Sequence, residues 1–192
     1  MTKKSNLLIL SLLITLGLFS FLTLHHFALK VGLGADAVCT LSSSINCDAA
    51  ATSSFAEIFG IPVAVLGASL HLIILGFVLC YRSGLTEASV YLRTSLRGLL
   101  LVAGIATLVM AVLSAFVVKV LCPFCAATYV FAIINLYLGW NLVPEGSGKK
   151  TDWAAYAGPY RSHLIAIVCV PVLAWIASGM IESNYGLDQL KR

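Results

Sequence analysis

The sequence predicts an all-α integral membrane protein with five transmembrane helices. Of its 192 residues, 60% are hydrophobic and only 10% are charged, whereas about a quarter of the residues in a soluble domain are charged. Five segments lack Asp, Glu, Lys and Arg, and each is long enough to cross about 30 Å of hydrocarbon. They are residues 6–29, 61–81, 98–118, 121–143 and 163–181. No repeat or low-complexity linker divides the chain, so residues 1–192 are predicted to form a single membrane domain.

The distribution of Lys and Arg predicts the orientation. One side of the membrane would hold eight cations and the other side four, and the richer side is expected to be cytoplasmic. The richer set is Lys3, Lys4, Arg82, Arg93, Arg97, Lys149, Lys150 and Arg161; the poorer set is Lys30, Lys119, Lys191 and Arg192. The N-terminus is then cytoplasmic, and residues 30–60 form an outer loop. The net charge of +4 comes without a basic patch interleaved with aromatic residues, so no nucleic-acid partner is indicated.

A cleaved signal peptide is the alternative for residues 6–29. Lys3 and Lys4 would suit its charged beginning, and Ala35-Asp36-Ala37 imitates a cleavage site. However, the apolar run is longer than a typical signal-peptide core, and the site lies well beyond its end. We therefore expect residues 6–29 to remain as the first span.

A Cys-x-x-Cys pair opens the fourth span. Pro123 follows Cys122 and suits the first turn of a helix, so Cys122 is predicted to cap that helix, with Cys125 one turn deeper. A helix N-terminus stabilises a thiolate. Such a pair indicates redox chemistry, half of a metal site, or two ordinary membrane cysteines. Because the chain has no second Cys-x-x-Cys and its four His are scattered, we expect no metal.

A second pair of cysteines lies in the outer loop. Cys39 and Cys47 would face the same oxidising side of the membrane as Cys122. A mobile pair beside a fixed pair could relay electrons by thiol–disulfide exchange, while the plainer alternative is a static staple between Cys39 and Cys47. Cys80 and Cys169 fall within spans two and five, where they are expected to serve only for packing.

The rest of the outer loop predicts a short amphipathic helix over residues 49–59, which would cap the bundle. Its apolar positions Phe55, Ile58 and Phe59 follow helical spacing, and Gly60 would end it. His25 and His26 lie toward the outer end of span one, within reach of the cysteines. They could handle protons, or they could form hydrogen bonds to neighbouring segments.

Taken together, these motifs resemble the vitamin K epoxide reductase family, and its bacterial members in particular. The resemblance spans roughly residues 5–145 and is carried by Cys39, Cys47-Asp48, Ser53, Phe59-Gly60-Ile61-Pro62, Gly67, Cys122-x-x-Cys125 and Thr128-Tyr129. It implies a four-helix bundle around a quinone site, with a fifth, peripheral helix. Another family of quinone-linked disulfide oxidases carries the two cysteine pairs in the opposite order.

The resemblance also implies roles for single residues. Cys39 would take electrons from a partner dithiol, Cys47 would pass them to Cys122, and Cys125 would reduce a bound ubiquinone or menaquinone. Ser53 would donate a hydrogen bond to the quinone, and Tyr129 would lie over its ring. Without the resemblance, the serine reads as a turn residue and the tyrosine as an interfacial aromatic.

Two departures from the family bear on function. An apolar residue near Val63 stands where members that reduce the epoxide carry Asn, so we expect thiol oxidation rather than epoxide reduction. Only residues 182–192 follow the last span, whereas many bacterial relatives carry a thioredoxin-like domain there. The expected partner is therefore a separate periplasmic thioredoxin-fold protein, which this bacterial inner-membrane enzyme would reoxidise at the expense of the quinone pool. The alternatives are an epoxide or quinone reductase, and a scaffold with structural cysteines.

Overall fold

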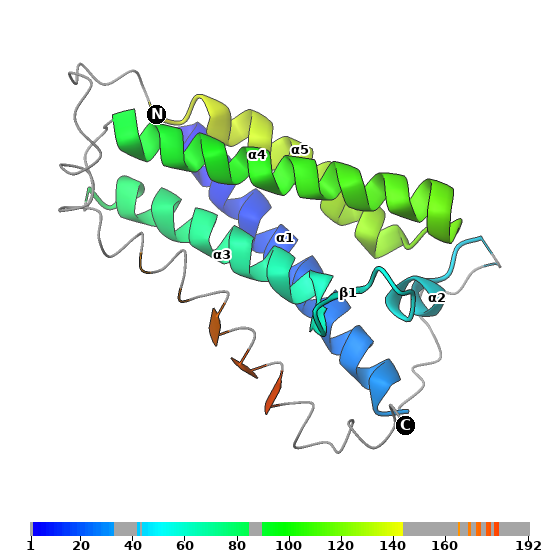
Figure 1. Cartoon of the computed structure of the whole chain (residues 1–192). Helices are drawn as coiled ribbons and strands as arrows, with labels where there is room; N and C mark the ends of the chain where they lie inside the picture. Colours follow the sequence, from blue (N-terminus) through cyan, green and yellow to red (C-terminus); the bar gives the residue numbers. More distant parts are fainter. Residues whose placement is uncertain are drawn as a thin grey trace.

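Four long helices dominate the computed structural model (Figure 1). They are α1 (Thr2–Lys30), α3 (Val63–Arg82), α4 (Val90–Val112) and α5 (Pro123–Trp140). α4 runs directly into a π-helical segment, η1 (Leu113–Val118). The structure describes residues 2–32, 42, 44–84 and 90–143, and the single positions 165, 169, 172, 173, 176, 177, 179 and 180.

All four helices are long and apolar enough to cross a membrane. The corresponding segments are Lys3–Lys30, Val63–Arg82, Tyr91–Val118 and Pro123–Trp140. The chain is therefore a helical membrane protein, and the first four predicted spans are confirmed as helices of spanning length. The predicted fifth span, 163–181, lies mostly outside the described residues. Its described positions are helical, and its place as a fifth span stays a prediction.

α4 begins eight residues before the predicted span 98–118, because charged residues limit a membrane span but do not end a helix. Arg97, in the second turn, donates from Nε to the carbonyl oxygen of Trp140 at 2.8 Å. Its guanidinium also lies 4.8 Å from the centre of the Trp140 ring. The arginine thus satisfies a carbonyl at the C-terminal end of α5, where such groups lack helical partners.

The four helices pack as a bundle. α1 contacts α3 and α5, and α4 contacts the same two helices, so each helix has two neighbours. The main buried core draws on the N-terminal half of α1, the C-terminal half of α3 and the N-terminal half of α4. It contains Leu8, Leu12, Ile73, Ile74, Leu75, Phe77, Val78, Leu92, Leu96, Leu100, Ala103, Leu142 and Val143. Packing is therefore concentrated at the end of the bundle that holds the N-terminus.

A short segment covers the opposite end of the bundle (Figure 1). This cap (residues 44–62) contains the one-turn helix α2 (Cys47–Ala51) and an antiparallel hairpin of β1 (Glu57–Ile58) and β2 (Ile61–Pro62). The side-chain oxygen of Asn46 accepts the Ala49 N–H at 3.0 Å and so caps α2.

The predicted helix over residues 49–59 is wrong beyond Ala51. Phe59 and Gly60 both adopt positive φ, 53° and 79°, which is the geometry of a two-residue hairpin turn with right-handed strand twist. This turn pairs Ile58 with Ile61 instead of continuing the helix. Phe59 is consequently 96% exposed at the tip of the hairpin rather than packed on the bundle.

Candidate active site

Cys122 stands at the N-terminus of α5, as predicted. Lys119 adopts a left-handed conformation with φ of 56° at the end of η1. Three residues later Cys122 is extended and caps α5, with Pro123 as the first helical residue. The backbone N–H of Cys125 donates to the Cys122 sulfur at 3.3 Å. The capping group is therefore a sulfur that can accept hydrogen bonds as a thiolate.

The surroundings of Cys122 favour that thiolate. A hydrogen bond from the Cys125 thiol lowers the pKa of Cys122 to about 7, although burial acts in the opposite direction. The backbone N–H groups of Cys125 and Phe124 add to the lowering. An attacking thiol is most effective when its pKa lies near the ambient pH, so Cys122 is suited to be the nucleophile of the pair.

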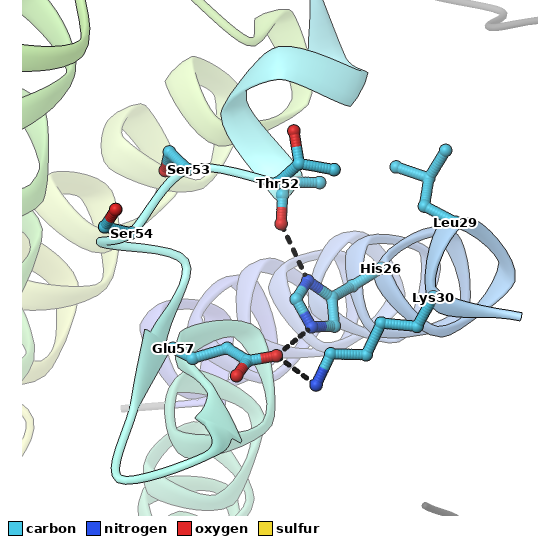
Figure 2. Close-up of a pocket in the computed structure, with 8 residues that line it drawn as sticks. His26, Leu29, Lys30, Thr52, Ser53, Ser54 and Glu57 are labelled. Atoms are coloured by element: carbon cyan, nitrogen blue, oxygen red, sulfur yellow. Dashed lines mark hydrogen bonds and ion pairs between the residues drawn. The ribbon is translucent and has the colours of Figure 1, made fainter. Parts of the chain in front are cut away.

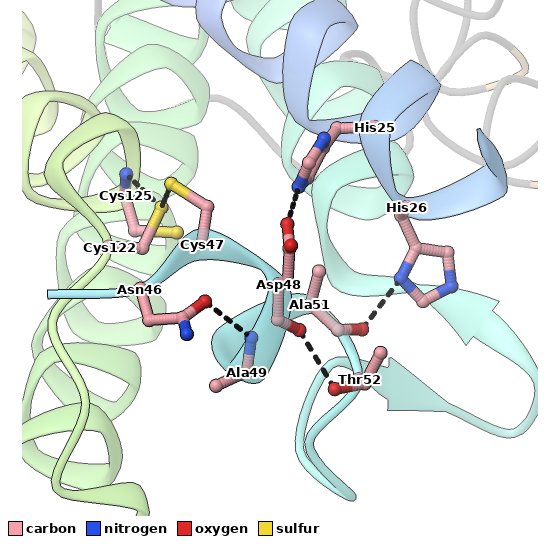
Figure 3. Close-up of polar contacts among 10 residues, drawn as sticks. All are labelled: His25, His26, Asn46, Cys47, Asp48, Ala49, Ala51, Thr52, Cys122 and Cys125. Atoms are coloured by element: carbon pink, nitrogen blue, oxygen red, sulfur yellow. Dashed lines mark hydrogen bonds and ion pairs between the residues drawn. The ribbon is translucent and has the colours of Figure 1, made fainter. Parts of the chain in front are cut away.

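Cys47 lies directly against Cys122, 75 residues away in the chain. The backbone N–H of Asn46 donates to the carbonyl oxygen of Leu121 at 3.2 Å, and the Leu121 N–H donates to that of Ser44 at 2.8 Å. This short parallel bridge sets the first residue of α2 beside the first turn of α5. The two sulfurs are 3.3 Å apart (Figure 3), and the residues are only 1% and 2% exposed.

The redox states of these cysteines differ. Cys47 takes part in a disulfide, whereas Cys122 and Cys125 are free thiols. The separation of 3.3 Å between Cys47 and Cys122 exceeds the S–S bond length of about 2.05 Å, yet it leaves no room for an intervening atom. A thiol of lowered pKa therefore faces a disulfide sulfur at the distance from which exchange begins.

Apolar side chains pack against the buried Cys47 and Cys122. Leu22, Ala50 and Phe124 pack around the cysteines, and the rings of Phe21 and Phe124 lie 4.4 Å apart. Pockets for small organic cofactors are mostly apolar, with a few polar groups. The chemistry of these residues therefore fits a quinone ring, for which thiols would be the electron donors.

The two predicted quinone contacts are placed differently. Tyr129 lies one turn beyond Cys125 on α5 and is half-buried. Ser53 lies in the turn after α2, where its hydroxyl donates to the carbonyl oxygen of Ala50 at 2.8 Å. It lines a pocket of about 360 Å³ (Figure 2). Within the described part of the chain, no hydrogen bond or ring contact joins Ser53 to Cys125 or Tyr129. The structure thus brings Cys47, Cys122 and Cys125 together, while the roles of Ser53 and Tyr129 as quinone contacts stay predictions.

The remaining cysteines have no visible part in the site. Cys39 lies outside the described residues, so its predicted role is not tested. Cys80 is half-buried near the C-terminal end of α3. Cys169 is exposed, so its predicted packing inside the protein is wrong. No group of three His, Cys, Asp or Glu side chains suited to a metal occurs among the described residues.

Two carboxylates to which the sequence assigned no role contact the histidines of α1. Nε2 of His25 lies 2.9 Å from a carboxylate oxygen of Asp48, and Nε2 of His26 lies 2.8 Å from one of Glu57. Lys30 also pairs with Glu57. Burial acts to raise the pKa of Glu57, but the hydrogen bonds from Lys30 and His26 outweigh it, and that pKa is lowered. In the sequence, the signal for these contacts was two adjacent histidines followed by a loop with acidic residues. This pattern suggests that they pair but does not say which histidine contacts which acid.

The fold and site together define a helical membrane protein in which a pair of free thiols lies against a disulfide-bonded cysteine. The model of the vitamin K epoxide reductase family matches residues 6–140, and the chain belongs to this family. Its members are quinone-linked thiol oxidoreductases in general, so the protein is an oxidoreductase of the membrane. No curated protein matches the chain.

Proposed function

We propose that the protein is a quinone-dependent thiol oxidase that reoxidises a separate thioredoxin-fold protein and thereby supports disulfide formation. The observation that carries the proposal is the distance of 3.3 Å between the sulfurs of Cys47 and Cys122. This contact links a cysteine of the outer cap to the Cys-x-x-Cys pair. A static staple in the outer loop would have no need of a reactive thiol at that distance.

The thiol steps balance within the chain. A reduced partner gives two electrons to the Cys39–Cys47 disulfide and becomes oxidised itself. The Cys47 thiolate then attacks Cys122 of an oxidised Cys122–Cys125 pair, and Cys125 leaves as the thiolate. Cys39 next attacks Cys47, which restores the loop disulfide and releases Cys122. The product has a disulfide at Cys47 and free thiols at Cys122 and Cys125, the same states as in the structure.

The acceptor would be a membrane quinone, ubiquinone or menaquinone. When bound, it takes up two electrons and two protons and so returns the Cys122–Cys125 pair to the disulfide. Phe21, Phe124 and Tyr129 would form the apolar surroundings of the ring, and Ser53 is the polar contact that the family resemblance implies. The part of this chain is to hold the Cys122 thiolate and to exclude water from the buried sulfurs.

The cellular setting belongs to the same proposal. The N-terminus would be cytoplasmic, and the cysteines would face the periplasm across a bacterial inner membrane. Oxidised structural disulfides persist on that side of the membrane. Lys3, Lys4 and Arg82 lie at the end of the bundle opposite to Cys47, in keeping with the positive-inside rule.

The direct test supplies a reduced periplasmic thioredoxin-fold protein and a soluble quinone, and follows the quinone absorbance. Turnover should require both reagents and should fall by about 1,000-fold or more in Cys125→Ala, because the dithiol is then incomplete. Cys80→Ala is the matched control and should keep full activity. A protein with purely structural cysteines would show no quinone reduction in any variant. Turnover of menadione epoxide would assign the site to epoxide reduction instead.

The role of Cys39 can be separated in the same assay. Cys39→Ala should lose electron transfer from the protein partner, while a small dithiol should still reduce the Cys122–Cys125 pair directly. Equal losses with both donors would show that Cys39 is structural or that its role belongs to Cys47.

A further inference from the structure

Two adjacent histidines at the outer end of α1 hold both ends of α2, the helix that begins with Cys47. We propose that His25 and His26 are positioning residues that keep the Cys47 sulfur within reach of Cys122 during exchange. The inference rests on the proposed function, since it concerns the transfer of electrons between these two cysteines. It adds two residues to the site that do not themselves touch a sulfur.

His25 acts on the beginning of α2. Its ring is buried, with 8% of the residue exposed, and it stacks on Phe21 at a centroid distance of 6.0 Å. Its Nε2 lies 2.9 Å from Asp48, the residue that follows Cys47. Figure 3 shows the Asp48 side chain turned toward His25 and the Cys47 side chain turned toward Cys122. The pair therefore fixes the rotation of α2 and turns a carboxylate away from the sulfurs.

His26 acts on the end of α2. Its Nδ1 lies 3.0 Å from the carbonyl oxygen of Ala51, the last residue of the helix, and its Nε2 lies 2.8 Å from Glu57 (Figure 2). Both partners accept hydrogen bonds, because the lowered pKa of Glu57 keeps its carboxylate ionised. Each ring nitrogen of His26 thus has a polar partner in the cap, one at the end of α2 and one in the hairpin. Lys30 holds Glu57 from the other side.

α2 depends on such contacts because it cannot stabilise itself. A helix of five residues is too short to persist alone. On the side of α5 it is held by the bridge between Ser44, Asn46 and Leu121. On the side of α1 the histidine contacts supply the described polar links between α1 and the two ends of α2. Without them the bridge becomes a hinge, and Cys47 can move away from Cys122.

The test isolates the sulfur exchange from all other steps. In a Cys125→Ser background, the Cys122 thiolate attacks the Cys47 sulfur of the loop disulfide. The bond from Cys47 to its former partner breaks, that partner leaves as a thiolate, and the Cys47–Cys122 bond forms without any oxidant. Cys125 can no longer open the mixed disulfide, and only the released thiolate can reverse the step, so the rate measured is that of the approach to equilibrium between the two disulfides. Its formation is followed by acid quenching, alkylation and peptide mass spectrometry, with neither quinone nor protein partner present.

His25→Ala and His26→Ala should each slow this exchange by about 10-fold to about 100-fold, since a displacement of about 1 Å can cost a factor of that size. His25→Gln should recover most of the rate, because its amide can donate to Asp48. His71→Gln is the matched control, because this buried histidine of α3 bonds to the carbonyl oxygen of Gly67 and not to the cap. The pH midpoint of the Cys122 thiolate should stay unchanged, which a general loss of structure would not allow.

A double-mutant cycle completes the test. The variant with both His25→Ala and Asp48→Ala should be no slower than the slower single variant, since the two residues act as one pair. Independent, multiplicative losses would overturn the role of the pair. If His25→Ala does not fold, Asp48→Ala decides alone, and an unchanged exchange rate in that variant would contradict the proposal. Dependence on the histidines in a protein that never reduces quinone would leave this inference intact while removing the proposed function.

Discussion

At the scale of single residues, the two cysteines of the Cys-x-x-Cys pair have unequal surroundings. Cys122 receives hydrogen bonds from the thiol and backbone of Cys125, and it faces the cap. Cys125 lies one turn deeper in α5 and is half-buried. Cys122 is thus the cysteine of the pair that lies within exchange distance of Cys47, and the role of Cys125 as electron donor to a quinone stays a proposal. This difference follows from the position of Cys122 at the N-terminus of α5.

The thiolate of Cys122 should be measurable. Its fraction should rise with pH through a midpoint near 7, because the deprotonated form dominates above the pKa. The ultraviolet absorbance of the thiolate, taken as the difference from Cys122→Ser, reports this fraction. Cys125→Ala removes the strongest hydrogen bond, so the midpoint should move up toward the ordinary value of about 8.5. A wild-type midpoint already near 8.5 would contradict the nucleophilic role.

At the scale of elements, the contact between α1 and α3 sets the width of the bundle beneath the cap. A Cβ added at Gly67 would lie 2.5 Å from the Phe19 ring, and no real Cβ comes so close to another atom. The ring cannot yield easily, since Phe19 also packs against His71 at a centroid distance of 5.2 Å. Gly67 therefore permits the two helices to approach where the first residues of α3 meet the cap.

Gly67→Ala should consequently lower the free energy of unfolding by about 1–3 kcal/mol, the usual cost of overpacking. Gly76→Ala on the same helix is the matched control, because no atom lies within 4 Å of its added Cβ. Alanine is the better helix former by about 0.5–1 kcal/mol, so this control should be neutral or stabilising. Thermal unfolding in detergent compares the two, and equal effects would mean that the Phe19 contact is not tight.

The elements also show where sequence reasoning succeeds. The first four spans were predictable because a long apolar segment satisfies its backbone hydrogen bonds in lipid by forming a helix. The start of α5 at Cys122 was predictable because Pro123 marks the first helical turn. The start of α4 was not, since Arg97 is accommodated by Trp140, 43 residues away. The hairpin was missed because Phe55, Ile58 and Phe59 fit helical spacing, while the positive φ of Phe59 has no signature in a phenylalanine.

The site was predictable only in part, for a related reason. A Cys-x-x-Cys motif can be recognised from its local spacing. The approach of Cys47 to Cys122 instead depends on the backbone bridge between Ile45 and Leu121, which are far apart in the chain. The partners of His25 and His26 likewise lie 23 and 31 residues away. The residue types indicated the kind of chemistry. The distances and the pairings depend on tertiary contacts, which cannot be read from the residue pattern of a single sequence.

At the scale of the whole molecule, the two ends of the bundle differ in packing and in charge. Its apolar core is concentrated near the N-terminus, while the cysteines, the histidines and the cap gather at the other end. The cations are also divided, with Lys3, Lys4, Arg82, Arg93 and Arg97 toward the first end and Lys30 and Lys119 toward the second. Tight packing and positive charge thus lie at one end of the bundle, and the reactive groups lie at the other.

This difference between the two ends predicts which end faces outward. Ser54 in the cap and Ser83 after α3 are both exposed serines, and they lie at opposite ends of the bundle. We expect a membrane-impermeant maleimide to label Ser54→Cys in intact spheroplasts, and Ser83→Cys only after permeabilisation, because the cationic end should be cytoplasmic. Both substitutions are made in a background whose native cysteines are replaced by alanine, and denatured protein gives the full label. Labelling of Ser83→Cys alone in intact cells would invert the topology and place the cysteines in the reducing cytoplasm. There the loop disulfide would be unstable, so the proposed oxidation of a periplasmic partner would fall with it.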